Sequence, residues 1–120
     1  MTDPRQALGL RAEEVVANWL ATNGWSVLHR RWRVPEGELD LVCRDARGVL
    51  VGVEVRARSS ARAGGALESL DRRRIGRLRR ALGRYAAASD EPGRLRLDLV
   101  TVDRAVDGWR LARHPGIDGW

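Results

Sequence analysis

Residues 37–58, GELDLVCRDARGVLVGVEVRAR, contain the pattern that decides the fold. Two apolar runs, 38–43 and 49–58, are separated by the turn-like residues 44–48. Side chains in the second run alternate with the period of a β-strand, and a short polar turn between two such runs is typical of a hairpin. We therefore expect neighbouring strands here. The four valines of the second run should pack, while the opposite face should present charge.

Acidic side chains gather on this predicted hairpin. Glu38 and Asp40 share one face of the first strand, and Glu54 and Arg56 share one face of the second, so the correct register would bring carboxylates and a cation together. Oxygen ligands of this kind suit Mg²⁺ or Mn²⁺, and such an ion supports hydrolysis of a phosphodiester. The alternative is that the same carboxylates form cross-strand ion pairs with Arg56 and Arg58. The residues alone leave both interpretations open.

Working outward, the flanking segments predict a single α/β domain over residues 1–120. Helical spacing runs from Pro4 to the stop at Asn23-Gly24, with Glu13 at the edge of the buried stripe. Residues 59–66 read as a basic, mobile loop. The remaining expected elements are strands over 25–34, 38–43 and 49–58, a helix over 68–88 and a strand over 94–102. The predicted order is α-β-β-β-α-β, and a last short strand through Trp109–Leu111 stays open.

Charge and composition indicate which classes of binding partner to expect. The 22 basic residues are all Arg, and with 16 acidic residues they give a net charge of +6. This excess favours polyanions, nucleic acid first and an anionic membrane second. No apolar run approaches the roughly 18 residues of a membrane span, and no signal peptide is evident. The single Cys43 cannot form an internal disulfide, which fits a reducing cytoplasm.

Arginines line one side of the second predicted helix. Their positions, Arg73, Arg77, Arg80 and Arg84, form a ridge that could follow nucleic-acid phosphates, although a solvated helix face explains the spacing equally well. Arg74 differs because it flanks the apolar stripe, from which it could reach the acids or a phosphate. Among the tryptophans, Trp19 and Trp25 fit core positions, and Trp32 is the candidate for a partly exposed ring.

The segments Gly37-Glu38-Leu39-Asp40-Leu41-Val42 and Val53-Glu54-Val55-Arg56-Ala57-Arg58 resemble the GE(I/L)DL and VEV(K/R)xR signatures of the YraN-like family of small bacterial proteins. Gly9 with Glu13 is similar to that family's opening helix, and 96–100 to its R-F-D-V-V strand. The family belongs to the PD-(D/E)xK superfamily, which includes relatives of Holliday-junction resolvases. The resemblance implies a restriction-endonuclease-like fold with a mixed central sheet flanked by helices.

The same resemblance implies roles for individual residues. Asp40 and Glu54 would bind Mg²⁺ or Mn²⁺, with the carbonyl of Val55 as an extra ligand, Glu13 as a third acid and Glu38 in support. Arg56 stands where the family usually has a catalytic Lys. Because a guanidinium is planar and stays protonated, Arg56 could stabilise phosphate charge but could not act as a base. We assign nucleic-acid contacts to Arg58, Arg73, Arg74 and Arg77.

The expected function is that of a nucleic-acid-binding protein and metal-dependent endonuclease. Relatives alone point to branched DNA, so DNA ranks before RNA as the partner, and cutting both strands of a junction would favour a homodimer. The competing expectation is a catalytically inactive nucleic-acid-binding or adaptor protein that retains the nuclease fold. Loss of both Asp40 and Glu54 would then leave nucleic-acid affinity intact.

Overall fold

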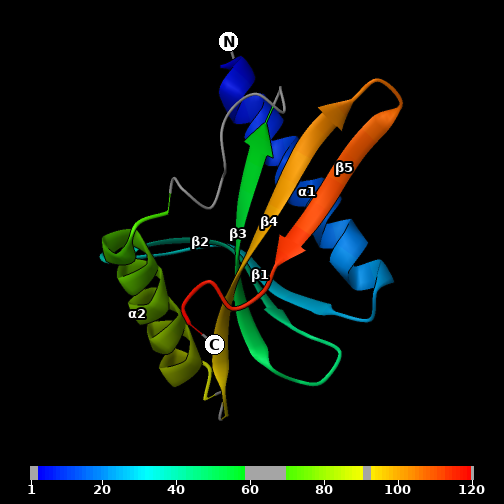
Figure 1. Cartoon of the computed structure of the whole chain (residues 1–120). Helices are drawn as coiled ribbons and strands as arrows, with labels where there is room; N and C mark the ends of the chain where they lie inside the picture. The colour runs from blue at the N-terminus through cyan, green and yellow to red at the C-terminus, as the bar shows by residue number, and fades with distance from the viewer. Residues whose placement is uncertain (1–2, 59–69, 91–92, 120) are drawn as a thin grey trace.

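The computed structural model describes residues 3–58, 70–90 and 93–119, which form a mixed five-stranded sheet and two helices (Figure 1). The elements in chain order are α1 Pro4–Thr22, β1 Ser26–Val34, β2 Gly37–Arg44, β3 Leu50–Arg58, α2 Arg72–Ala88, β4 Leu95–Ala105 and β5 Gly108–His114. The mixed α/β class is confirmed. The predicted order α-β-β-β-α-β was one strand short, because β5 is a full partner of β4. The basic loop expected over 59–66 lies outside the described residues.

The five strands lie in the order β1-β2-β3-β4-β5. The first three form an antiparallel meander, and the predicted hairpin is confirmed with Cys43 opposite Val51 and Leu41 opposite Val53. Strand β4 pairs with β3 in parallel and β5 returns antiparallel. A parallel neighbour requires a long crossover, and α2 lies within this one. The carboxyl end of β3 therefore faces the start of α2.

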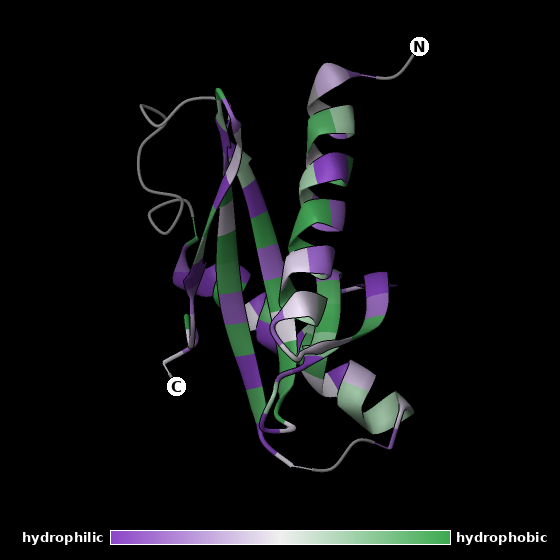
Figure 2. Ribbon diagram, turned by 90° about the vertical axis from the view of Figure 1, so that its right-hand side faces the viewer, coloured by the Kyte–Doolittle hydropathy of each residue, from purple (hydrophilic) through white to green (hydrophobic). Residues whose placement is uncertain are grey.

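Each face of the sheet is covered by one helix, and Figure 1 shows α1 and α2 on opposite sides. Between α1 and the sheet, the buried residues include Val16 and Leu20 of the helix and Val53 of β3. Between α2 and the sheet, they include Leu82 of the helix and Leu50 of β3. Hydrophobic residues predominate in the central strands, with hydrophilic bands between them (Figure 2). The prediction that β3 has one packed and one charged face was wrong for its first half, since α1 covers one face of the sheet there and α2 covers the other. Charge appears only toward the carboxyl end of β3.

Helix α2 begins at Arg72, four residues later than predicted, because Asp71 forms its N-cap. The Asp71 Oδ1 atom accepts a hydrogen bond of 2.8 Å from the backbone N–H of Arg74, the usual way in which Asp satisfies the first turn of a helix. The predicted apolar stripe is confirmed, with Leu78, Ala81, Leu82 and Tyr85 all buried. This packing directs the opposite, arginine-rich side of α2 away from the core.

Candidate active site

Asp40 of β2 and Glu54 of β3 lie together where the two strands separate. The ladder between the strands extends to the pair Leu41 and Val53. Beyond it, the Asp40 Oδ2 atom accepts a hydrogen bond of 2.9 Å from the backbone N–H of Val55. The Asp40 side chain thus replaces a backbone partner, and the two carboxyl groups hydrogen-bond to each other. This is the carboxylate pair that the hairpin register predicted.

The pair lines a cavity of about 490 Å³ between the sheet and the start of α2. Acidic and basic side chains both contribute to its wall. The lining residues are Glu36, Gly37, Glu38, Asp40, Glu54, Asp71, Arg73, Arg74, Arg77 and Leu78. A volume of this order accommodates a small ligand or a short segment of a polymer.

Burial makes two neighbouring negative charges costly at this position. Burial and the charge of Glu54 raise the pKa of Asp40 from 3.8 to about 8. Burial also raises the pKa of Glu54, but the charges of Arg74 and Arg56 oppose this effect. Near neutral pH the Asp40 carboxyl group is therefore mostly protonated, whereas the charges of Arg74 and Arg56 favour the ionised form of Glu54. Carboxyl groups with raised pKa values suit a divalent cation, which can displace the proton and bind the carboxylate oxygens.

Two guanidinium groups flank Glu54. The Arg74 Nη2 atom lies 3.1 Å from Glu54 Oε1, whose side chain is 7% exposed, so the prediction that Arg74 could reach the acids is confirmed. Arg56 follows Glu54 by two positions on β3, and its Nε and Nη2 atoms are buried without a hydrogen-bond partner among the described residues. Leaving such donors unpaired costs free energy. Arg56 therefore carries unused capacity for an anionic oxygen beside the acid pair.

Glu13 and Glu38 are each paired with an arginine of β1. Glu13 of α1 forms an ion pair of 2.9 Å with Arg31 and lines a neighbouring hollow of about 360 Å³ instead of the acid cavity. Its charge still reaches Asp40, where it contributes to the raised pKa. Glu38 borders both hollows and pairs with Arg33 at 2.6 Å. Glu13 is therefore close enough to influence the site electrostatically without contacting the acid pair directly.

The arginines assigned to nucleic acid occupy different positions. Arg73 and Arg77 line the acid cavity, and Arg77 Nε donates a hydrogen bond of 2.8 Å to the carbonyl of Glu36. Arg58 instead forms two hydrogen bonds, of 2.7 and 2.9 Å, with Asp103 of β4. An arginine already paired in this way within the sheet is a weaker candidate for a phosphate contact than the rim residues of α2.

Sequence reasoning missed Asp71 and Glu36. Asp71 had a usable signal, since an Asp directly before a helical run is the usual N-cap. Glu36 sits in the turn between β1 and β2, pairs with Arg84 at 2.6 Å and keeps a buried Oε2 atom without a partner in the described chain. A turn glutamate has no pattern that predicts such a contact, because it depends on the crossover that brings α2 back to the turn.

Within the described residues, no group of three or more His, Cys, Asp or Glu side chains has an arrangement that could hold a metal ion. The acid site accordingly offers two carboxylates from the protein, and an ion bound there would complete its coordination with water or substrate oxygens, as Mg²⁺ commonly does.

No helix in the described part of the chain is long and apolar enough to cross a membrane.

A family model described as "Uncharacterised protein family UPF0102" matches residues 12–102. A UPF0102 protein of Beutenbergia cavernae is 41% identical over 92% of this chain and 93% of its own length. A UPF0102 protein of Frankia alni is 44% identical over 92% of each chain. The solved structure of Pyrococcus furiosus SfsA in complex with Ca²⁺ has 10% identity and a TM-score of 0.34, over 92% of this chain and 63% of that one.

Proposed function

The chain belongs to the uncharacterised protein family UPF0102, and we propose that it is a metal-dependent endonuclease that hydrolyses phosphodiesters of nucleic acid. One observation carries the proposal. Asp40 and Glu54, from adjoining strands, form a buried pair with raised pKa values in a cavity rimmed by arginines. Buried acids with perturbed pKa values that converge in a hollow are typical of functional sites.

The donor set fits Mg²⁺ or Mn²⁺. Asp40 and Glu54 would hold the ion, which supplies Lewis-acid polarisation of a phosphate and a lowered pKa for water. Arg56 would stabilise negative charge on the phosphate, because its buried Nε and Nη2 atoms lack a partner among the described residues and its charge persists at any working pH. Arg74 offsets the charge of Glu54. Arg73 and Arg77 at the rim would attract the polyanionic backbone.

The restriction-endonuclease-like fold is part of the same proposal. Its support is the order of elements, in which a helix precedes an antiparallel meander and a crossover helix leads to a parallel strand, with the acids at the point where β2 and β3 separate. DNA, including branched DNA, is the proposed substrate because residues 37–42 and 53–58 resemble the signatures of a family whose superfamily has Holliday-junction resolvases among its structural relatives. A reducing cytoplasm is the proposed location, since buried Cys43 is a free thiol.

A second function is favoured by two observations. Arg56 stands where the family usually has Lys, and the described residues contain no group of three or more His, Cys, Asp or Glu side chains that could hold a metal ion. A protein with these features could bind nucleic acid on the arginine rim of α2 without cleaving it. In that case the acid pair would be structural, with Asp40 retained for its hydrogen bond to Val55.

Cleavage assays separate the two functions. Labelled duplex, single-stranded and four-way-junction DNA, and RNA, are incubated with the protein in Mg²⁺, Mn²⁺ or EDTA. We expect metal-dependent cutting by wild type, loss with Asp40→Asn/Glu54→Gln, and no change with Glu14→Gln, an exposed acid on α1. Arg56→Met should abolish cutting, and Arg56→Lys should retain it. No cutting by wild type, with salt-sensitive binding unchanged in the acid variant, would refute the nuclease and support the binding protein.

A further inference from the structure

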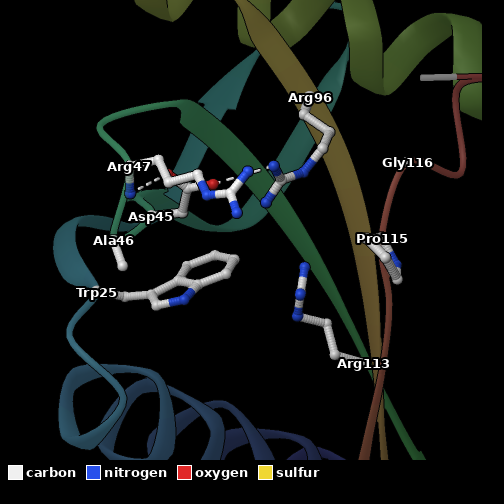
Figure 3. Close-up of a pocket in the computed structure, with 8 residues that line it drawn as sticks. All are labelled: Trp25, Asp45, Ala46, Arg47, Arg96, Arg113, Pro115 and Gly116. Atoms are coloured by element: carbon white, nitrogen blue, oxygen red, sulfur yellow. Dashed lines mark hydrogen bonds and ion pairs between the residues drawn. The ribbon is translucent and has the colours of Figure 1, made fainter.

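A second cavity, of about 500 Å³, lies on the other face of the sheet from the acid pair. It sits beyond the carboxyl end of α1, where Trp25 begins the return toward β1, and β4 contributes Arg96 to its wall (Figure 3). Its lining residues are Trp25, Asp45, Ala46, Arg47, Arg96, Arg113, Pro115 and Gly116. None of them borders the acid cavity, so the two sites can be altered separately.

A fully buried carboxylate anchors this cavity. Asp98 of β4 is 0% exposed and accepts hydrogen bonds from Arg96 Nε at 2.8 Å and Nη2 at 3.1 Å. It also accepts from Arg113 Nη1 at 2.9 Å and from the Gly116 N–H at 3.0 Å. Arg96 reaches further to Asp45 at 3.0 Å, and its side chain is 9% exposed. These contacts fix two guanidinium groups in place before any ligand arrives.

Three guanidinium groups meet at this cavity. Those of Arg96 and Arg113 lie over the Trp25 ring, at 5.8 and 5.3 Å from its centroid, in the range of cation–π contacts. Figure 3 shows the Arg47 side chain extending over Trp25 toward Arg96. The backbone N–H of Arg47 donates to Asp45 Oδ1 at 2.9 Å, which holds the turn that presents this side chain.

A purely structural role explains only part of this arrangement. The network ties the turn after β2, strand β4 and the segment after β5 together, which accounts for Arg96 and Asp98. It does not account for Arg47, whose exposed guanidinium has no ion-pair partner in the described part of the chain. Three arginines against two aspartates leave one excess positive charge, and like charges that converge repel each other unless an anion joins them.

We propose that this cavity binds a phosphate group carried by a nucleoside, with Arg47 and Arg113 contacting the phosphate and Arg96 held behind them by Asp98. The planar fork of an arginine matches phosphate oxygens, and pairs of this kind are among the stronger hydrogen bonds in proteins. The cavity is larger than a phosphate alone requires, so it has room for the attached sugar and base. A free nucleotide and the end of a nucleic-acid chain both present this chemistry.

Calorimetric titration of the full chain tests this site. The probes are adenosine 5′-monophosphate, adenosine, inorganic phosphate, and one oligonucleotide with and without a 5′-phosphate. Each lost guanidinium contact should weaken binding of the phosphorylated probes by about tenfold, measured with Arg47→Gln and with Arg47→Gln/Arg113→Gln. Arg104→Gln is the matched control, because Arg104 lies over the Trp109 ring at 5.7 Å and does not line the cavity.

The outcomes distinguish the sources of the phosphate. Binding of the mononucleotide in preference to the oligonucleotides identifies a free nucleotide, and binding of the 5′-phosphorylated oligonucleotide alone identifies a chain end. Either result supports the site, provided that Arg47→Gln weakens it and Arg104→Gln does not. Equal binding by wild type and Arg47→Gln, or no binding of any phosphorylated probe, would overturn the proposal. Asp40→Asn should leave this binding unchanged, so a failed nuclease does not affect the result.

Discussion

Replacing Asp40 by Asn should stabilise the protein at alkaline pH. In wild type, burial and the charge of Glu54 raise the pKa of Asp40 from 3.8 to about 8. Between these pH values the native state binds a proton that the unfolded state has lost, so wild-type stability falls as pH rises and levels off above about pH 8. Asn imitates the protonated carboxyl group, since its oxygen can accept from the Val55 N–H and its amide can donate to Glu54.

The magnitude follows from the pKa of Asp40. Between pH 5 and pH 9 wild type should lose stability over the interval up to about pH 8, which at about 1.4 kcal/mol for each pH unit is roughly 4 kcal/mol. The acid cavity is open to solvent at its rim, so water can partly hydrate the ionised pair and reduce this penalty. We therefore expect the advantage of Asp40→Asn over wild type to grow by about 2–4 kcal/mol from pH 5 to pH 9.

Urea denaturation in EDTA, at pH 5 and pH 9, measures this difference as a change in the free energy of unfolding. Glu14→Gln is the control, because it removes the same charge from an exposed site and should change stability equally little at both pH values. The reasoning would be refuted if the advantage of Asp40→Asn were the same at both pH values, or if the variant were less stable than wild type at pH 9.

Three further predictions concern the surroundings of the site and the core. Arg74→Gln should lower the free energy of unfolding by about 1–2 kcal/mol at pH 9, because Glu54 loses its partner. The loss should be smaller at pH 5, where Glu54 is more protonated. Urea denaturation that gave the same loss at both pH values would contradict this. Gly52→Ala should lower the free energy of unfolding by about 1–2 kcal/mol, since the added carbon would lie 3.0 Å from a buried leucine methyl. Gly83→Ala in α2, where the added carbon would have nothing within 4 Å, should raise it by about 0.5–1 kcal/mol. Burial raises the pKa of the Cys43 thiol to about 12, so a thiol reagent at pH 8 should react only after unfolding; rapid labelling of native protein would show that the thiol is accessible.

The acid pair was predictable because it depends on local rules. The alternation in 49–58 and the short turn before it set the hairpin register, and the register places Asp40 near Glu54. The same rules gave the apolar stripe of α2 and the position of Arg74. Predicting these features requires only the periodicity of strands and helices and the position of one hairpin.

The features that sequence reasoning missed depend on contacts between distant elements. The sequence could not show that α2 would cover Leu50, because this follows from the parallel pairing of β3 with β4. Glu36 meets Arg84 for the same reason. Trp25 packs against the core, as its alternation predicted, but the sequence did not show that its ring also lies beneath two arginines, one on β4 and one on β5. Pairings at such sequence separation have no local signal.

The arginines around the acid pair decide which of its members holds the proton. Arg74 and Arg56 both lower the pKa of Glu54, whereas the largest influences on Asp40 are burial and the charge of Glu54. The two similar carboxyl groups are thereby distinguished, because the raised pKa keeps Asp40 mostly protonated near neutral pH while the two guanidinium groups favour the ionised form of Glu54. A lysine at position 56 could lose its charge in such a buried setting, but a guanidinium does not. In a chain without lysine, Arg56 therefore keeps this asymmetry constant over the whole pH range in which the pair titrates.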